Sequence, residues 1–175
     1  LVAGQVEEVL ATVSDADVQA NEGAFSRRLK ALADSLPQVQ DIWVLDSAGH
    51  PLVSANVYPV PRALDLSDRA YFRVFRDQSQ PPDELYVSEV LRGRVHGVSF
   101  FQVSKDRRQG ASGAFAGVVA VSVQPLYFQD FYRSVAAGGF DTMTLIREDG
   151  AVLARYPDRA DAPVVLPADS AFIRN

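Results

Sequence analysis

A hairpin pattern occurs twice in this chain, and this repeat constrains the fold more than any other feature. The sequence IWVLDSAGHPLVSA covers residues 42–55, and TLIREDGAVLARYP covers residues 144–157. Aligned on Gly49 and Gly150, each has an apolar run, a polar turn that contains Asp and ends in Gly, and a second apolar run. Glycine can adopt the positive φ angles that tight turns need. We therefore predict two β-hairpins, each opening a copy of the same module.

The spacing of the hairpins is that of tandem domains. Solenoid repeats are about 20 to 50 residues long, whereas these hairpins are roughly 100 residues apart. The second copy starts too near the end of the 175-residue chain to contain every strand of the first. We predict an N-terminal helical segment over residues 1–36, a first module over 37–137, and a linker with an incomplete second module over 138–175.

Composition excludes several classes of function. Hydrophobic residues make up 47% of the chain, enough to bury a core, and the net charge of −5 argues against a nucleic-acid partner. The absence of cysteine excludes disulfides and thiolate chemistry, and two histidines leave little for a metal site, so we predict no cofactor. No window approaches eighteen consecutive apolar residues. We expect a soluble fragment, with any signal peptide or membrane span removed or never present.

Two apolar stripes with helical spacing stand at the start of the chain. One over Leu1–Ala20 predicts a long amphipathic helix, interrupted at residues 21–23, and another over residues 24–36 ends before Pro37. Both stripes can pack on the core of the domain. The first can alternatively form the seam of a homodimer.

The middle of the chain has the two-residue period of strands. Short polar loops, among them RGRVHG and KDRRQGASG, join these strands, which implies an antiparallel sheet and an α+β fold. A short helix within residues 65–77, capped by Ser67 or Asp65, and a helix over 126–137 complete the order. The predicted strands are 42–45, 51–55, 85–90, 98–105 and 115–123.

Enzyme signatures are scarce. The chain contains no GxSxG, P-loop or HExxH motif. Asp46 and Asp149 each belong to a turn in which Asp bonds its own backbone, and His50 and His96 fall in exposed loops. We therefore predict no catalytic residue.

The stretch DLSDRAYFRVFRD, residues 65–77, is the strongest candidate for binding. On the predicted helix, Arg69 and Arg73 lie four residues apart and share a face with Phe72, while Tyr71 and Phe75 form a second pair with this spacing. Two guanidinium groups beside aromatic rings could clamp a carboxylate, sulfonate or phosphate. Alternatively, the rings cover the sheet and the arginines are solvated.

The last predicted strand of the sheet indicates space beside one face. In GVVAVSVQP, the face that contains Val118, Ala120 and Ser122 becomes small and ends polar, while the alternate face is bulky. The space above the small face can hold a ligand, or it can receive a phenylalanine from the helix above.

Taken together, these segments resemble the double Cache family, the extracytoplasmic PAS-like sensor domains of bacterial histidine kinases, diguanylate cyclases and chemoreceptors. The resemblance covers nearly the whole chain: LADSLPQVQDIWVLDSAGHPLVSA, LSDRAYFR, LYVSEVLRGRVHGVSFFQVSK, GAFAGVVAVSVQPLYFQDFY and the restart MTLIREDGAVLARYP. It implies a PAS-like module with a central five-stranded antiparallel sheet. It also implies a receptor anchored by flanking transmembrane helices in a bacterial inner membrane. This fragment would be periplasmic and non-catalytic, with an output domain such as a histidine kinase in the cytoplasm.

The resemblance also implies where a ligand binds. In members that bind amino acids, an Arg-x-aromatic-aromatic segment holds the carboxylate, and it falls here on Arg69, Tyr71 and Phe72. A later strand supplies an Asp for the amino group, but that position falls on Ser122, whose hydroxyl cannot neutralise an ammonium group. We therefore predict a small ligand that is anionic and lacks an amine. The candidate residues are Arg69, Tyr71, Phe72, Arg73, Tyr86, Ser88, Ala120 and Ser122.

Two other functions remain open at this point. A PAS-like module can lose its ligand and serve as a structural or dimerisation module, in which case its own side chains should fill the space beside Tyr71. An enzyme would instead need a cleft in which titratable groups converge.

Overall fold

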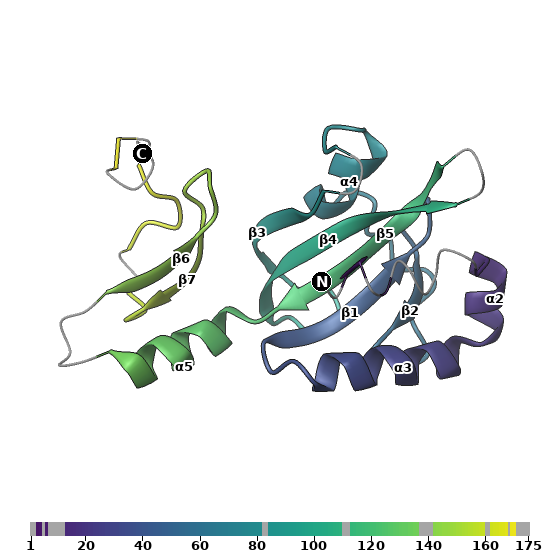
Figure 1. Ribbon diagram of the computed structural model, residues 1–175, viewed down its shortest axis with the longest axis horizontal. Helices are drawn as coiled ribbons and strands as arrows, with labels where there is room; N and C mark the ends of the chain where they lie inside the picture. The colour runs from purple at the N-terminus through teal and green to yellow at the C-terminus, as the bar shows by residue number, and fades with distance from the viewer. Residues whose placement is uncertain are drawn as a thin grey trace. The chain divides into compact units, whose positions relative to one another are not determined.

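The computed structural model describes two compact units (Figure 1). One contains residues 1–88 and 102–123, and the other contains 89–101 and 124–175. The predicted boundaries at 36 and 137 stay predictions. The described residues are 3, 4, 6, 13–81, 84–109, 113–136, 142–159, 162–167, 169 and 170. The elements are α2 (Asp15–Ala20), α3 (Glu22–Asp34), β1 (Val39–Leu45), β2 (Pro51–Ser54), α4 (Ala70–Arg76), β3 (Tyr86–Arg92), β4 (Ser99–Gln109), β5 (Ala114–Val123), α5 (Pro125–Val135), β6 (Met143–Ile146) and β7 (Val152–Tyr156).

The main sheet has five strands in the order β2-β1-β5-β4-β3, which confirms the predicted α+β fold. One boundary was wrong, because β4 continues to Gln109 and includes KDRRQ, which we assigned to a turn. The charged residues Asp106 and Arg107 are both buried there, at 2% exposure each. Both charged side chains have partners in the fold, which allows this part of the chain to be a buried strand. The amino-acid composition alone does not show those partners.

The continuous helix predicted over Leu1–Ala20 is broken before α2. Ser14 adopts an extended conformation, and its hydroxyl oxygen accepts a hydrogen bond of 3.1 Å from the backbone N–H of Asp17. A serine in this position starts a helix, because it supplies an acceptor to the unpaired first turn. Only Asn21 separates α2 from α3, so the predicted interruption over residues 21–23 was too long.

The apolar stripe of the N-terminal segment packs within its own chain where the structure describes it. Val6 is 4% exposed and Val18 is fully buried. This favours core packing for these two side chains over a dimer seam. The other members of the predicted stripe, except Val13, lie outside the described residues: Val2, Val9 and Leu10.

Helices cover the main sheet on opposite sides (Figure 1). α3 packs against β1 and β2 and buries Leu29 and Ala33, while α4 packs against β5. Within the strands, Ile42, Val44 and Val53 are completely inaccessible to solvent. The hydrophobic core of this unit therefore lies around β1 and the neighbouring central strand β5, whose Val118 and Val119 are also fully buried.

The two hairpins repeat each other in detail, which confirms that the motif occurs twice. Gly49 has φ +91° and Gly150 has φ +87°. Each amide donates to the carbonyl three residues earlier, to Asp46 at 3.1 Å and to Arg147 at 2.8 Å. Both hairpins also shift register just before the turn, between Val44 and Leu45 in the first and between Leu145 and Ile146 in the second.

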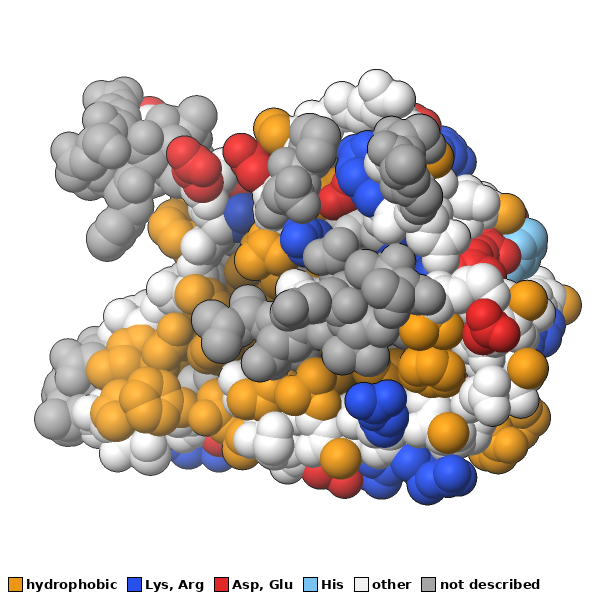
Figure 2. Space-filling model, turned by 45° about the vertical axis from the view of Figure 1, so that its right-hand side comes forward, with side chains coloured by type: hydrophobic (Ala, Val, Ile, Leu, Met, Phe, Trp, Pro, Cys, Tyr) orange, Lys and Arg blue, Asp and Glu red, His pale blue; other side chains and the backbone are white. Residues whose placement is uncertain are grey.

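The second unit contains α5, which packs against β7 of the second hairpin. Pro125 stands at the start of this helix, and the helix ends two residues before the predicted end. Much of its apolar surface is exposed, and Figure 2 shows apolar side chains on the face of the molecule that it draws. Within the described ranges, no helix is both long and apolar enough to cross a bilayer. The exposed apolar residues of α5 are Leu126, Tyr127, Phe131 and Val135.

Candidate functional site

The short helix α4 begins later than the sequence predicted. Its N-cap is Arg69, which has extended backbone geometry and makes no side-chain capping bond, so the predicted cap at Ser67 or Asp65 was wrong. The Asp65 carboxylate instead accepts a hydrogen bond of 2.8 Å from the backbone N–H of Ser67. That bond stabilises a turn before the helix, and the turn places Arg69 at the point where the helix starts.

The side chains of α4 divide between the interior and the solvent. Phe72 is fully buried and Tyr71 is 4% exposed, whereas Arg73 is exposed. Arg73 and Phe72 therefore do not share a face, contrary to the predicted arrangement, because adjacent helical positions diverge by about 100°. Arg69 is half-buried, and its Nε atom is inaccessible to solvent. Of the two arginines, only Arg69 reaches into the protein.

Hydrogen bonds identify the side of the sheet that faces α4. The hydroxyl of Ser104 on β4 donates to the backbone carbonyl of Tyr71 at 3.3 Å, and the carbonyl of Tyr86 lies 3.4 Å away. Gln102 is two residues from Ser104 and so shares its face. The hydroxyl of Ser122 donates to Oε1 of Gln102 at 3.0 Å, which places β5 residue Ser122 on this face as well.

Cross-strand pairs extend this face to β1. Asp41 pairs with Ser122, and Trp43 pairs with Ala120. Directly opposed residues in a sheet place their side chains on the same face. The face beneath α4 thus contains small, hydroxyl and amide groups, the indole of Trp43 and the carboxylate of Asp41. By alternation along β4, the buried carboxylate of Asp106 lies on this face as well.

Asp41 is buried, but its carboxylate is engaged. Its oxygens accept from the hydroxyl of Ser54 at 2.9 Å and from the backbone N–H groups of Ile42 at 2.7 Å and Asn56 at 3.1 Å. Burial raises the pKa of Asp41 above its usual value, and the hydrogen bonds from Ser54 and from the backbone partly oppose that rise. These bonds hold the chain at the end of β2, which is a structural role.

An irregularity at Gly117 determines which side of β5 faces α4. The ring of Phe115 contacts the ring of Phe72 at 5.7 Å between centroids, so both Phe115 and Ser122 face the α4 side. Positions separated by an odd number cannot share a face in a regular strand, so one residue must interrupt the alternation. Gly117 has φ +122°, and a Cβ there would stand 2.0 Å from the carbonyl oxygen of Leu45, so only glycine fits.

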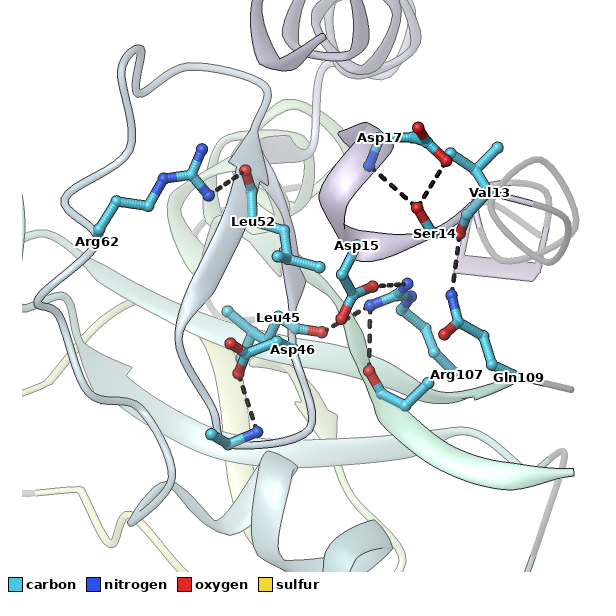
Figure 3. Close-up of polar contacts among 12 residues, drawn as sticks. Val13, Ser14, Asp15, Asp17, Leu45, Asp46, Leu52, Arg62, Arg107 and Gln109 are labelled. Atoms are coloured by element: carbon cyan, nitrogen blue, oxygen red, sulfur yellow. Dashed lines mark hydrogen bonds and ion pairs between the residues drawn. The ribbon is translucent and has the colours of Figure 1, made fainter. Parts of the chain in front are cut away.

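The opposite side of β4 carries a buried ion pair (Figure 3). The guanidinium of Arg107 donates to the carbonyls of Leu45 at 3.0 Å and Ala116 at 3.2 Å, and to the carboxylate of Asp15 at 2.8 Å. Two residues further on, the side chain of Gln109 donates to the carbonyl of Val13 at 2.9 Å. These contacts attach the start of α2 to the end of the sheet.

The structure brings most of the predicted site residues to one region, where α4 meets the sheet. Tyr71 and Tyr86 meet at Ser104, while Ser88 accepts a hydrogen bond of 2.9 Å from the backbone N–H of Gln102. Arg73 is the exception, since it is exposed. The residues that sequence reasoning missed are Asp41, Gln102, Ser104 and Arg107.

A signal for part of β4 was present in the sequence. In FQVS, Gln102 and Ser104 alternate with apolar residues, which is the period of a strand, whereas KDRRQ is polar at every position and shows no such period. The signal for Asp41 was weaker. A single acidic residue before an apolar strand usually belongs to a loop, and only the fold shows that its oxygens are used.

The chemistry available at this site is recognition. Among the described residues, no group of three or more His, Asp or Glu side chains could hold a metal ion. The polar groups on the face are hydroxyls and one amide, which donate and accept hydrogen bonds but do not exchange protons near neutral pH. The carboxylate of Asp41 accepts hydrogen bonds from Ser54 and Asn56, and that of Asp106 accepts one from Arg108 at 2.6 Å.

Comparison with solved structures gives several similar proteins. The extracellular domain of rpHK1S-Z16, assigned as a histidine kinase, is 31% identical, with a TM-score of 0.75 over 98% of this chain and 69% of that chain. The ligand-binding domain of the Campylobacter jejuni chemoreceptor Tlp3, in complex with 4-methylisoleucine, is 15% identical, with a TM-score of 0.66 over 93% of this chain. That of the Pseudomonas aeruginosa PAO1 chemoreceptor PctC, in complex with GABA, is 18% identical, with a TM-score of 0.64 over 90% of this chain.

The chain is shorter than these relatives. It spans 65% of the Tlp3 domain and 65% of the PctC domain. Neither a protein-family model nor a curated protein matches the sequence. At 31% identity over nearly the whole chain, the histidine kinase domain shows a common family, while the chemoreceptor domains show the fold.

Proposed function

Because this chain belongs to the double Cache family of extracytoplasmic sensor domains, we propose that it senses a small anion that carries no ammonium group. Arg69 is the proposed anion-binding residue, with Tyr71 and Phe72 as the adjoining aromatic surface. The observation that carries this proposal is the position of Arg69. Its Nε atom is inaccessible to solvent at the start of α4, the helix that carries the buried residues Tyr71 and Phe72.

The chemistry of this sheet face supports a ligand without an amine. Ser88, Gln102 and Ser122 are all buried and electrically neutral. Asp41 shares the face, but its oxygens accept from Ser54 and from backbone amides. An ammonium group bound here would lose its water without gaining an uncommitted carboxylate, which is unfavourable. Tyr86 and Ala120 complete the proposed surface, and the exposed Arg73 would add charge at its edge.

The full-length protein is proposed to be a bacterial transmembrane receptor. The similarity to the extracellular domain assigned to a histidine kinase supports an output domain of that type in the cytoplasm. Flanking transmembrane helices would connect the two sides. A homodimer through Leu1–Ala20 also remains a proposal.

A thermal-shift experiment tests the ligand class. The fragment is screened against small carboxylates, sulfonates, phosphates and zwitterionic amino acids, and hits are repeated with Arg69→Ala. A ligand that binds only the folded state stabilises it by about 2.7 kcal/mol at a hundredfold excess over Kd, which raises the unfolding midpoint. We expect shifts from carboxylates that disappear in Arg69→Ala, and small or absent shifts from amino acids.

Two further variants make this experiment specific. Arg133→Ala removes an exposed arginine of α5 and should leave every shift unchanged. Arg73→Ala measures the contribution of the second predicted arginine, which should be smaller because that side chain is exposed. Strong binding of amino acids would contradict the proposed ligand class. No shift from any compound, in a folded fragment, would indicate a ligand-free structural module.

A further inference from the structure

The side chain of Gln102 is almost completely enclosed. It is 1% exposed, on the part of β4 that lies between β3 and β5. Its backbone N–H donates to the hydroxyl oxygen of Ser88 at 2.9 Å. Its side-chain oxygen Oε1 accepts from the hydroxyl of Ser122 at 3.0 Å. Serines on both neighbouring strands therefore hold this residue in place.

The amide nitrogen of Gln102 is not used in the same way. With Oε1 directed at Ser122, the planar amide turns Nε2 away from that serine. Within the described part of the chain, Nε2 donates no hydrogen bond and is not fully closed off from solvent. A donor in such a nearly enclosed position is available to a water or a ligand.

The position of Gln102 fits a ligand held at its other end by Arg69. Ser104 contacts the backbone carbonyl of Tyr71, two residues after Arg69 in the chain. Gln102 lies two residues from Ser104 along the same face of β4, a separation of about 7 Å. A short molecule could therefore reach from the start of α4 to the amide of Gln102.

We infer that Gln102 is a specificity-determining residue of the site, whose Nε2 donates to a second oxygen of the ligand. This inference rests on the proposed function, and it narrows the ligand class to short dicarboxylates and oxo- or hydroxycarboxylates. An amide N–H pairs with a carboxylate, carbonyl or hydroxyl oxygen and repels an ammonium group. The same donor discriminates against a monocarboxylate with a plain alkyl end, which would leave Nε2 unpaired.

Four probes of similar size test the inference by calorimetry: succinate, pyruvate, propionate and L-valine. In the wild-type fragment, succinate and pyruvate should bind about tenfold more tightly than propionate, which is the contribution of one buried hydrogen bond. Gln102→Met should remove this difference and leave the Kd for propionate unchanged. Gln129→Met, the same substitution on α5, should change no Kd.

Gln102→Glu gives a test that misfolding cannot imitate. It keeps the shape and the acceptor for Ser122 but replaces the amide N–H group with a carboxylate oxygen. Succinate binding should fall by at least about tenfold through charge repulsion, and L-valine binding should appear or strengthen. A gain of function of this kind requires a folded site.

The outcomes separate the two proposals. If carboxylates bind and depend on Arg69, but succinate, pyruvate and propionate bind equally in wild type and Gln102→Met, the role of Gln102 is refuted and the proposed function stands. If no carboxylate binds, or if Arg69→Ala has no effect on binding, the proposed function fails and the inference fails with it. Valine binding by wild type that is unchanged in Gln102→Glu also overturns the inference.

Discussion

The two faces of β4 use buried polar groups differently. On the α2 side, the guanidinium of Arg107 has three hydrogen bonds, two to strand carbonyls and one to Asp15. On the α4 side, the side chain of Gln102 has one, to Ser122. Both residues are about equally buried, at 2% and 1% exposure. Burial therefore does not distinguish an anchor from a recognition group, but the use of hydrogen-bonding capacity does.

Asp41 shows that this distinction does not follow the faces of the sheet. It lies on the same face as Ser122, yet its oxygens accept from Ser54, Ile42 and Asn56. The hydrogen bonds of Asp41, like those of Arg107, stabilise the fold. The neutral cluster around Gln102 is the part of the α4 face for which we propose a ligand.

Removing the anchor on the α2 side should have the largest effect. Arg107→Met keeps the length of the side chain but leaves two buried carbonyls and the Asp15 carboxylate without their donor. The free energy of unfolding should fall by about 3 kcal/mol, measured by urea denaturation. Asp15 is partly exposed, so water reduces the penalty on that side.

An exposed ion pair provides the control for this variant. Arg133→Met breaks the pair with Asp130, in which both side chains are more than half exposed. Its effect should be within about 0.5 kcal/mol. Equal losses of stability from Arg133→Met and Arg107→Met would remove the basis for calling Arg107 an anchor.

Asp41 should produce an intermediate effect that depends on pH. Because burial raises its pKa in the folded state, the folded protein binds the proton more tightly than the unfolded chain does. The contribution of Asp41 to the free energy of unfolding is therefore most favourable at pH values below the usual aspartate pKa. It is lost as the pH rises through the raised pKa. Asp41→Asn should abolish this component.

The measurement is the difference in unfolding free energy between wild type and Asp41→Asn across pH 3 to 8. Carboxylates with lowered pKa values, such as Asp65 and Asp149, stabilise in the opposite direction, but they are common to both proteins and cancel in the difference. Wild type should lose stability relative to Asp41→Asn as pH rises. A difference that is constant with pH would contradict the buried, pKa-shifted Asp41.

The smallest effect on stability is expected where ligand recognition is proposed. Ser122→Ala alone leaves Oε1 of Gln102 unpaired and should cost about 1 kcal/mol. The double variant Ser122→Ala/Gln102→Met removes both partners and should lie within about 0.5 kcal/mol of wild type, measured by the same denaturation. A double variant that loses as much as Arg107→Met would place Gln102 among the anchors.

Most of the fold could be predicted because its signals are local. Gly49 and Gly150 indicate the two hairpin turns. The apolar stripes of the helices and the alternation of the strands are visible within short stretches of sequence. The end of β4 was missed for the opposite reason. Asp106 and Arg107 look like loop residues, and the burial of Arg107 depends on partners far away in the chain, such as Asp15.

The candidate site divides in the same way. Tyr71, Phe72, Ala120 and Ser122 could be found from aromatic spacing and alternation, together with the family resemblance. Gln102 could not, because its role depends on serines from two neighbouring strands and on which amide atom they occupy. Which donors and acceptors stay unpaired is decided by the folded structure. The order of residues in the sequence does not show it.

The irregularity at Gly117 has a practical consequence for anyone who edits this domain. Side chains in a strand alternate between the two faces of the sheet. If Gly117 were deleted, every later residue of β5 would therefore move to the opposite face. A homologue that lacks this residue, if aligned without a gap there, would have its positions facing α4 misassigned. A grafted or shortened β5 should therefore be counted from Gly117 toward Val123, not from the start of the strand.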